Sequence, residues 1–225
     1  DEDEIRPYSY RGTYINGFFE YDGKKYIDDV VGKIDCSTIF PVCDWTRMNL
    51  YVEGERFSLF SGKILEYGRE LTMQHGVLTR KIKWESPSGK VMNIENTRFV
   101  CPDRKHSALM RYSVEPLNFS GNITIRSEVK TRLSKEIIND KGLKEEFFFT
   151  HSIEEGEKEG RQYLKYRTNN SFLDLAMAFS HQITSDSNEI EEAAYFEKDN
   201  AVYEIKMQVS KDKKISIDKF ACFYT

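Results

Sequence analysis

The sequence predicts an all-β fold, a large antiparallel sandwich of two packed sheets in which one short helix at most interrupts the strands. Apolar and polar residues alternate with a period of two in one segment after another, and turn-forming residues separate these segments. No strand is followed by a long amphipathic helix, so the sequence shows no sign of a parallel sheet. The 225 residues contain too many such segments for a small sandwich, and we therefore expect residues 1–225 to form a single large domain.

The first clear strands lie in Arg47–Leu59 and are interrupted by a tight turn at Glu53-Gly54-Glu55. Polar residues separate the apolar ones before the turn, and the apolar face resumes after it. This face is formed by Met48, Leu50, Val52, Phe57 and Leu59. We expect these side chains to lie in the core.

A hairpin is predicted from Val77–Trp84 and Val91–Val100. Its first strand alternates an apolar side with a side of Thr and Lys residues. The connection Ser86-Pro87-Ser88-Gly89 suits a turn, because Pro fixes one backbone dihedral and Gly accepts a positive φ.

The rest of the chain continues the strand pattern. Further strands are predicted at Ala108–Val114, Ile123–Val129, Glu146–Thr150, Gln162–Thr168, Ser171–Ile183, Ala201–Val209 and Lys214–Phe223. The polar segment Ile153–Arg161 has the composition of an exposed hairpin tip. Asp186–Glu197 fits either a strand or a short helix, since its apolar residues satisfy both periods.

Composition excludes several classes of protein. Lys and Arg number 33 against 37 Asp and Glu, giving a net charge of -4, so the basic excess of a nucleic-acid-binding protein is missing. No apolar run approaches the roughly 20 residues of a membrane helix, and we expect no membrane partner. The acidic start Asp1–Glu4 does not resemble a signal peptide. The scattered Cys36, Cys43, Cys101 and Cys222 favour reduced thiols, and hence a cytoplasmic location.

No constellation of residues typical of catalysis is found. The sequence has no phosphate-binding glycine loop and no Gly-x-Ser-x-Gly elbow. Its 4 histidines are widely separated and form no metal-ligand pair, so we expect no metal site. Adjacent acids on a strand point to opposite faces and would not converge on one bond. We therefore assign no catalytic residue and no cofactor.

Two segments have the composition of a sugar site, Thr13–Glu20 and Pro41–Trp45. Both combine aromatic residues, which stack on the apolar face of a sugar, with short polar side chains that bind hydroxyl groups. A core aromatic residue beside an Asx turn explains the same pattern, and we favour that simpler interpretation. The candidate site residues are Tyr14, Asn16, Phe18, Asp44 and Trp45.

Several motifs occur in an order that resembles the N-terminal domain of glycoside hydrolase family 65, the inverting α-glucoside phosphorylases. They are Gly12–Glu20, Pro41–Trp45, Leu50–Leu59, Tyr67–Leu71 with Met73, Gly76–Arg80, Trp84–Lys90, Thr97–Val100, Ala108, Arg111-Tyr112 and Pro116-Leu117. The resemblance is good from about Gly12 to Val129 and thin afterwards. The motifs resemble those of the kojibiose and trehalose phosphorylases more than those of maltose phosphorylase.

This resemblance implies a β-sandwich of the kind called a super-sandwich, which precedes a catalytic (α/α)6 barrel in the same chain. Family members cleave an α-linked glucose disaccharide with inorganic phosphate as co-substrate and yield β-glucose 1-phosphate. Their general acid and phosphate-binding residues belong to the barrel, so none is transferred to this sequence. The chain then resembles an N-terminal fragment that is inactive alone, packs on the barrel and helps to shape the substrate pocket, with Tyr14, Asn16, Phe18, Asp44 and Trp45 on the barrel-facing side.

Two other hypotheses remain open from the sequence. A free-standing carbohydrate-binding module would expose aromatic side chains such as Tyr14, Phe18 and Trp45. An assembly domain would instead bury an apolar face in a homodimer.

Overall fold

The computed structural model describes residues 12–28, 32–130, 134–138, 144–186, 189–197 and 200–225, with the backbone alone described at 22–36 and 130–147. Strands account for the regular structure of these residues, and no helix occurs among them. The all-β prediction is confirmed. No helix in the described part of the chain is long and apolar enough to cross a bilayer.

Two antiparallel sheets form the sandwich. The first has 8 strands in the order β12-β13-β14-β17-β8-β7-β6-β5, and the second has 5 in the order β15-β16-β9-β3-β4. The strands of the first sheet are β5 (Lys63–Thr72), β6 (Val77–Glu85), β7 (Val91–Val100), β8 (Ser107–Pro116), β12 (Thr150–Lys158), β13 (Arg161–Thr168), β14 (Asp174–Thr184) and β17 (Ile215–Tyr224). Those of the second are β3 (Asp44–Val52), β4 (Glu55–Arg56), β9 (Gly121–Lys130), β15 (Ile190–Glu197) and β16 (Asn200–Val209).

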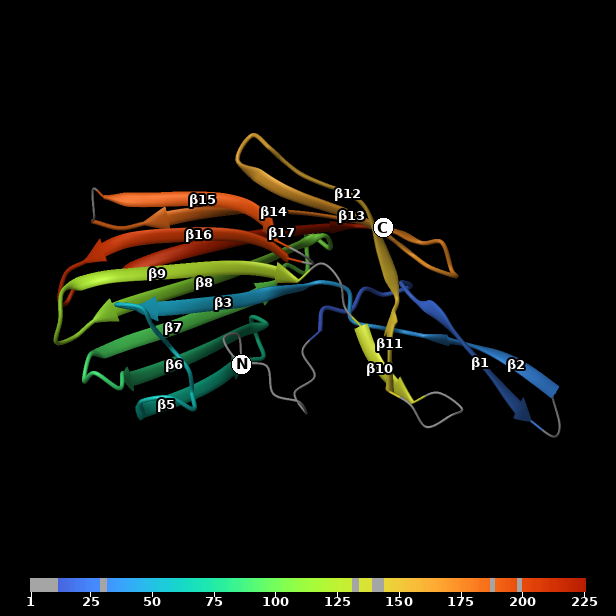
Figure 1. Ribbon diagram of the computed structural model, residues 1–225, viewed down its shortest axis with the longest axis horizontal. Coiled ribbons are helices and arrows are strands. Elements are labelled where there is room, and N and C mark those ends of the chain that lie inside the picture. The colour runs from blue at the N-terminus through green and yellow to red at the C-terminus, as the bar shows by residue number, and fades with distance from the viewer. Residues whose placement is uncertain (1–11, 29–31, 131–133, 139–143, 187–188, 198–199) are drawn as a thin grey trace.

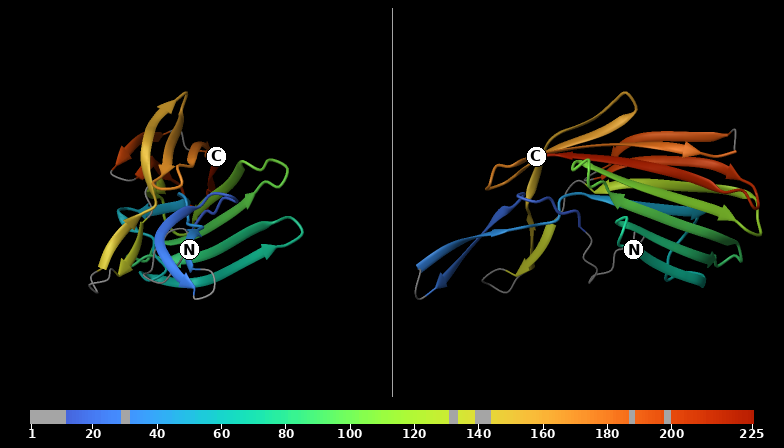
Figure 2. Two further views of the ribbon diagram at one scale, coloured as in Figure 1. Left: turned by 90° about the vertical axis from the view of Figure 1, so that its right-hand side faces the viewer. Right: turned by 180° about the vertical axis from the view of Figure 1, so that it is seen from behind.

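Two further hairpins project from one end of the sandwich, as Figures 1 and 2 show. They are formed by β1 (Glu20–Asp28) with β2 (Gly32–Thr38), and by β10 (Ser134–Ile138) with β11 (Lys144–Phe148). The last residue of the chain lies close to the place where these hairpins leave the sandwich (Figure 1).

The core lies between the sheets and follows the predicted alternation. Every second residue is buried along β13, over Arg80–Trp84 on β6 and over Met92–Asn96 on β7, and on β17 the buried face carries Ile215, Ile217, Lys219 and Ala221. Trp84 is fully buried, packs edge-on against Phe57 at 5.2 Å between ring centroids, and donates its Nε1–H to the Ser61 carbonyl at 2.7 Å. A buried Trp thus contributes a large apolar area without leaving its one donor unpaired.

The predicted turns adopt the expected backbone geometry. Glu53 and Gly54 have φ of 49° and 83°, and Gly89 in the hairpin turn has φ of 83°. Gly62 has φ of 75°, and a Cβ there would lie 2.2 Å from the Glu85 carbonyl oxygen. Only glycine fits this position, since the backbone is left-handed and the space is filled.

Some segments differ from the prediction. The part of Asp186–Glu197 from Ile190 onward forms strand β15, so the helical alternative is wrong. The segment Ile153–Arg161 is largely strand β12 with a turn at its end, and it is not a tip alone. Strand β5 was not predicted, because it lies at a sheet edge where nearly all its side chains are exposed and no alternation is needed.

Candidate functional site

The two segments predicted to form a sugar site lie side by side at the end of the sandwich from which the hairpins project. The Val42 amide donates to the Thr13 carbonyl at 2.8 Å, which ties the segments together. Tyr14, Asn16 and Trp45 line one pocket there, with a volume of about 310 Å³, which we call the end pocket. The sequence therefore brings these three predicted residues to one place, while Phe18 and Asp44 do not line the pocket.

Burial separates the predicted residues into two groups. Tyr14 is 56% exposed, whereas Phe18 and Trp45 are 1% and 4% exposed. Phe18 packs on Phe40 at 5.6 Å between ring centroids, so it is a core residue. The Asp44 carboxylate accepts from the amide and hydroxyl of Thr46 at 3.2 and 2.8 Å, which is the Asx turn that the simpler interpretation expects.

The opposite wall of the end pocket comes from residues that sequence reasoning missed. His106 places its Nδ1 2.7 Å from the Phe223 carbonyl oxygen and stacks on Tyr224, with 4.2 Å between ring centroids. Val100 and Lys105 complete this wall. No local signal could have identified His106, because its partners are more than 100 residues away in the sequence.

Exposed apolar side chains gather at the same end. The strand registers place the β5–β6 and β7–β8 turns, the β13–β14 connection and the end of β17 there. The large apolar residues exposed on these segments and on the neighbouring loops are Tyr14, Ile39, Leu71, Met73, Val100, Phe172 and Tyr224. We call this set the apolar end. Such a concentration is typical of a surface that packs against another domain.

Lys219, Cys43 and Asp44 form a buried ionisable cluster. Lys219 is fully buried, its Nζ donates to the Glu128 backbone carbonyl at 3.2 Å, and the ammonium lies 5.8 Å from the Phe179 ring centroid. Burial lowers the pKa of Lys219 to about 7, against the opposing charge of Asp44. Burial also raises the pKa of the neighbouring Cys43 thiol to about 12.

This cluster does not contact solvent, so its role is structural. The sequence carries a signal for it, because Lys219 falls in phase with the buried Ile215, Ile217 and Ala221 on β17. A lysine on the apolar face of a strand indicates a buried charge. Cys43, Cys101 and Cys222 are free thiols, and the side chain of Cys36 lies outside the described residues.

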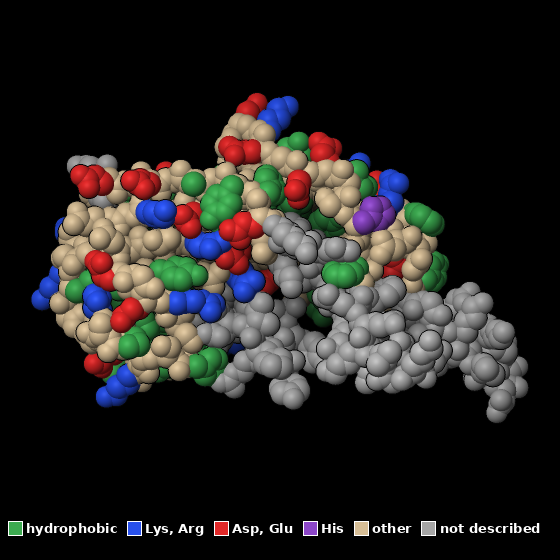
Figure 3. Space-filling model, viewed as in Figure 1, with side chains coloured by type: hydrophobic (Ala, Val, Ile, Leu, Met, Phe, Trp, Pro, Cys, Tyr) green, Lys and Arg blue, Asp and Glu red, His purple; other side chains and the backbone are tan. Residues whose placement is uncertain are grey.

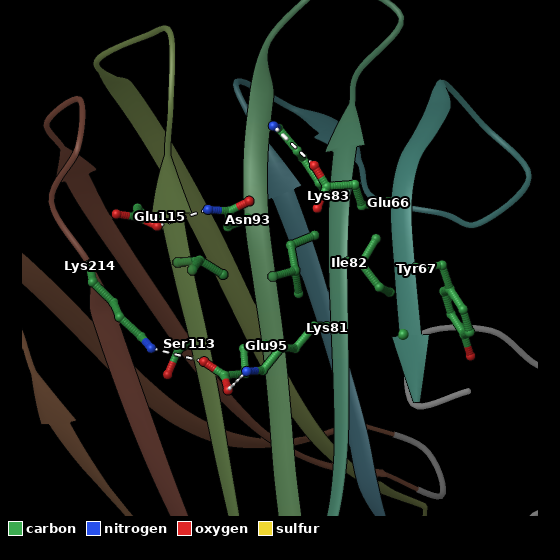
Figure 4. A pocket seen from close by; sticks show the side chains of 13 residues that line it. Glu66, Tyr67, Lys81, Ile82, Lys83, Asn93, Glu95, Ser113, Glu115 and Lys214 are labelled. Atoms are coloured by element: carbon green, nitrogen blue, oxygen red, sulfur yellow. Dashed lines mark hydrogen bonds and ion pairs between the residues drawn. The ribbon is translucent and has the colours of Figure 1, made fainter. Parts of the chain in front are cut away.

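A second pocket, of about 430 Å³, crosses the outer face of the larger sheet and is shown in Figure 4. Two rows of polar side chains cross the strands there. In one row the Lys83 ammonium donates to the Glu66 carboxylate at 3.3 Å, and the Asn93 amide donates to Glu115 at 2.9 Å. In the other row Glu95 accepts from Lys214 at 2.9 Å and lies 3.7 Å from Lys81.

A groove runs between these rows, and its floor is the backbone of four residues aligned across the sheet. Tyr67, Ile82, Ile94 and Val114 occupy adjacent register positions on β5, β6, β7 and β8, and all four line the pocket. Residues two apart on a strand are about 7 Å apart, which sets the distance between the rows. We call this feature the cross-strand groove.

The electrostatics of the groove favour fixed, charged side chains. The hydrogen bond from Lys214 is the main cause that lowers the pKa of Glu95, so this carboxylate is ionised over a wide pH range. Within the described residues, no group of three or more His, Cys, Asp or Glu is placed to hold a metal ion. The paired charges of the groove can bind a polar ligand. On the opposite face of the sandwich, that of the smaller sheet, the space-filling view in Figure 3 also shows acidic and basic side chains interspersed.

The fold and its pockets define a large antiparallel β-sandwich domain with one end suited to pack against a neighbour. Residues 1–225 match the family described as "Glycosyl hydrolase family 65, N-terminal domain". The chain belongs to this family, which confirms the resemblance inferred from its motifs.

Similar proteins include enzymes that are much longer than this chain. An alpha,alpha-trehalose phosphorylase of Thermoanaerobacter brockii is 33% identical over 226 residues, which cover 96% of this chain and 28% of the relative. A kojibiose phosphorylase of Caldanaerobacter subterraneus subsp. tengcongensis is 27% identical over 228 residues, with 95% and 27% covered. The chain thus spans just over a quarter of the length of these relatives.

A solved structure shares the fold. It is described as a candidate kojibiose phosphorylase from the human microbiome and superposes with a TM-score of 0.81 at 15% sequence identity, covering 100% of this chain and 28% of that one. In this neighbour the two-sheet architecture is therefore one part of a longer chain.

Proposed function

We propose that this chain is the non-catalytic N-terminal domain of a disaccharide phosphorylase. The whole protein would cleave an α-linked glucose disaccharide with inorganic phosphate and release β-glucose 1-phosphate and a free sugar, without a cofactor. The names of the relatives and their greater length support this proposal. The partner of the domain is then a catalytic (α/α)6 barrel in the same chain, in a cytoplasmic enzyme.

The observation that carries the proposal is the apolar end. Seven large apolar residues are exposed there, on segments from six parts of the chain. Covering this area with a neighbouring domain would remove it from water and stabilise both parts, at about 25 cal/mol per Å² of apolar surface. We propose that the catalytic domain packs here.

The end pocket places Tyr14, Asn16 and Trp45 beside this contact. We propose that these residues border the substrate pocket of the whole enzyme, where an amide and an aromatic face would contact the acceptor sugar. Of the three aromatic residues that a free-standing carbohydrate-binding module would expose, only Tyr14 is exposed. The docking role therefore explains the geometry better than the independent module.

Substitution of exposed residues in the full-length protein tests the proposal, because such variants keep the core intact. Tyr14→Ala and Asn16→Ala should raise KM for the acceptor sugar in the reverse reaction at least about 5-fold, with the domain still folded by circular dichroism. Trp45→Ala is less informative, since Trp45 is 4% exposed and its loss would also destabilise the core.

The matched control is Phe60→Ala. Phe60 is an aromatic residue that is 57% exposed and lies after β4, away from the apolar end. This variant should leave the kinetics unchanged. Unaltered kinetics in both Tyr14→Ala and Asn16→Ala would contradict the pocket assignment. A homodimer that uses the same apolar end would instead show concentration-dependent sedimentation that Tyr14→Ala and Tyr224→Ala reduce.

A further inference from the structure

We infer that the cross-strand groove is a binding site for an uncharged, linear oligosaccharide, separate from the end pocket. It occupies the outer face of β5, β6, β7 and β8, and Lys214, just before β17, reaches into it (Figure 4). The groove and the apolar end meet β17 at opposite ends. Lys214, which lines the groove, precedes the first residue of β17, whereas Tyr224 of the apolar end is its last residue. The groove therefore stays accessible when the apolar end is covered by another domain.

The charges of the groove indicate a neutral ligand. Its three lysines, Lys81, Lys83 and Lys214, are matched by three carboxylates, Glu66, Glu95 and Glu115. Each of these lysines lies within 4 Å of a lining carboxylate. A phosphate or a metal ion would need an excess of one sign, and the groove offers none.

The polar groups of the groove suit hydroxyl groups, since each hydroxyl both donates and accepts a hydrogen bond. Both rows combine donors with carboxylate acceptors: Lys83 and Asn93 lie between Glu66 and Glu115 in one, and Lys81 and Lys214 flank Glu95 in the other. The side chains are already held by contacts within their rows, for example Asn93 by Glu115 at 2.9 Å. Such preorganised groups lose little conformational entropy when a ligand binds.

The shape of the groove indicates an extended ligand. Its floor crosses four adjacent strands, which are about 4.8 Å apart, so the floor is about 14 Å long. An extended peptide would need a free strand edge or apolar pockets for its side chains, and the face of a paired sheet provides no such edge. A chain of sugar units satisfies both the length and the polarity.

Gly68 keeps the groove open. It lies opposite Lys81 on the edge strand β5, lines the pocket, and a Cβ added there would have no atom within 4 Å. Its φ is outside the left-handed region, so a larger residue would fit the backbone and would project into the groove. This position offers a variant that blocks the groove without disturbing the core.

The test measures binding of maltoheptaose and cellohexaose to the full-length protein by titration calorimetry, the choice of glucose oligomers resting on the proposed function. The wild type should show a binding event that Gly68→Gln weakens at least 10-fold and Asn93→Ala at least 3-fold. The matched control is Glu70→Gln, two residues from Gly68 on the same exposed strand and outside the groove, which should change affinity less than 2-fold.

The inference would be overturned if neither oligomer bound at about 10 mM, or if Gly68→Gln and wild type had equal affinity. It would also be overturned if inorganic phosphate or hexaglycine bound in preference to the oligomers and Gly68→Gln abolished that binding. Phosphorolysis of disaccharides is measured in parallel. Absence of phosphorolysis together with oligosaccharide binding lost in Gly68→Gln would refute the proposed function and leave the groove site in place.

Discussion

Lys219 should make the stability of this domain depend on pH in a defined direction. The amine is fully buried with a pKa of about 7, against 10.5 for an ordinary lysine. Between these values the unfolded chain holds a proton that the native chain has released. The unfolded state binds more protons, so the free energy of unfolding rises with pH, by about 1.4 kcal/mol per pH unit.

The neighbouring Cys43 limits the range of this rise. Its thiol has a pKa of about 12 in the fold against 9.0 for an ordinary cysteine, so above pH 9 the unfolded chain loses a proton that the native chain keeps. That difference lowers the free energy of unfolding as pH increases. The net gain from Lys219 is therefore confined to the interval from about pH 7 to pH 9 and amounts to about 2–3 kcal/mol.

Replacing Lys219 with Met removes the buried charge and keeps an unbranched side chain of similar length. Near neutral pH the desolvation penalty of Lys219 is about 4–5 kcal/mol from the pKa difference, and losing the donor to the Glu128 carbonyl costs about 1–3 kcal/mol. We expect Lys219→Met to be more stable than wild type by about 1–3 kcal/mol at pH 7. The advantage should vanish by pH 9.

Urea unfolding followed by tryptophan fluorescence at pH 7, 8 and 9 measures this difference. The control is Lys213→Met, since the side chain of Lys213 is 62% exposed, and it should keep the pH dependence of wild type. A Lys219→Met variant whose unfolding midpoint rises with pH as steeply as wild type would refute the assignment. So would a variant that is less stable than wild type at pH 7.

Three further substitutions test the turn at Gly62, the core at Phe57 and the buried imidazole of His181. Gly62→Ala should destabilise the chain by more than about 2 kcal/mol in urea unfolding, because the left-handed backbone costs about 1–2 kcal/mol and its Cβ would meet a carbonyl oxygen at 2.2 Å; Gly54→Ala, with open space around its Cβ, should show the backbone effect alone. Phe57→Ala should lower stability by about 3–5 kcal/mol through a core cavity, while the exposed Phe60→Ala should stay within about 0.5 kcal/mol. Burial holds the pKa of His181 well below 6.5. As pH falls, the unfolded chain therefore takes up a proton before the native chain does, and the free energy of unfolding decreases. His181→Asn should show a smaller decrease in this free energy between pH 6.5 and pH 5.

Much of the fold could be predicted from the sequence, for a physical reason that also limits the prediction. Where one strand face is buried and the other is wet, alternation must appear in the sequence, as it does from Val77 to Val100. The edge strand β5 is wet on both faces and leaves no such pattern. The helix alternative near Glu192 arose because the short apolar spacing of that segment satisfied both periods.

The candidate site could be predicted only in part. Local composition identified Tyr14, Asn16 and Trp45, which do meet in one pocket. It could not separate exposed aromatic residues from buried ones, so Phe18 was included although it is a core residue. The cross-strand groove depends on the register of four strands, and register is set by tertiary packing that no single segment encodes.

The unequal size of the two sheets explains why this domain exposes apolar residues at all. A sheet of 5 strands cannot cover the inner face of a sheet of 8. The core alternation weakens on the first residues of β6 and on the last residues of β7, which are paired with each other, and on β5 the side chains from Glu66 onward are all exposed. Leu71 and Met73 therefore stay in contact with water, at 52% and 82% exposure. An isolated domain would gain stability by extending the smaller sheet, so the exposed Leu71 and Met73 at the apolar end are better explained as surface that a neighbouring domain completes.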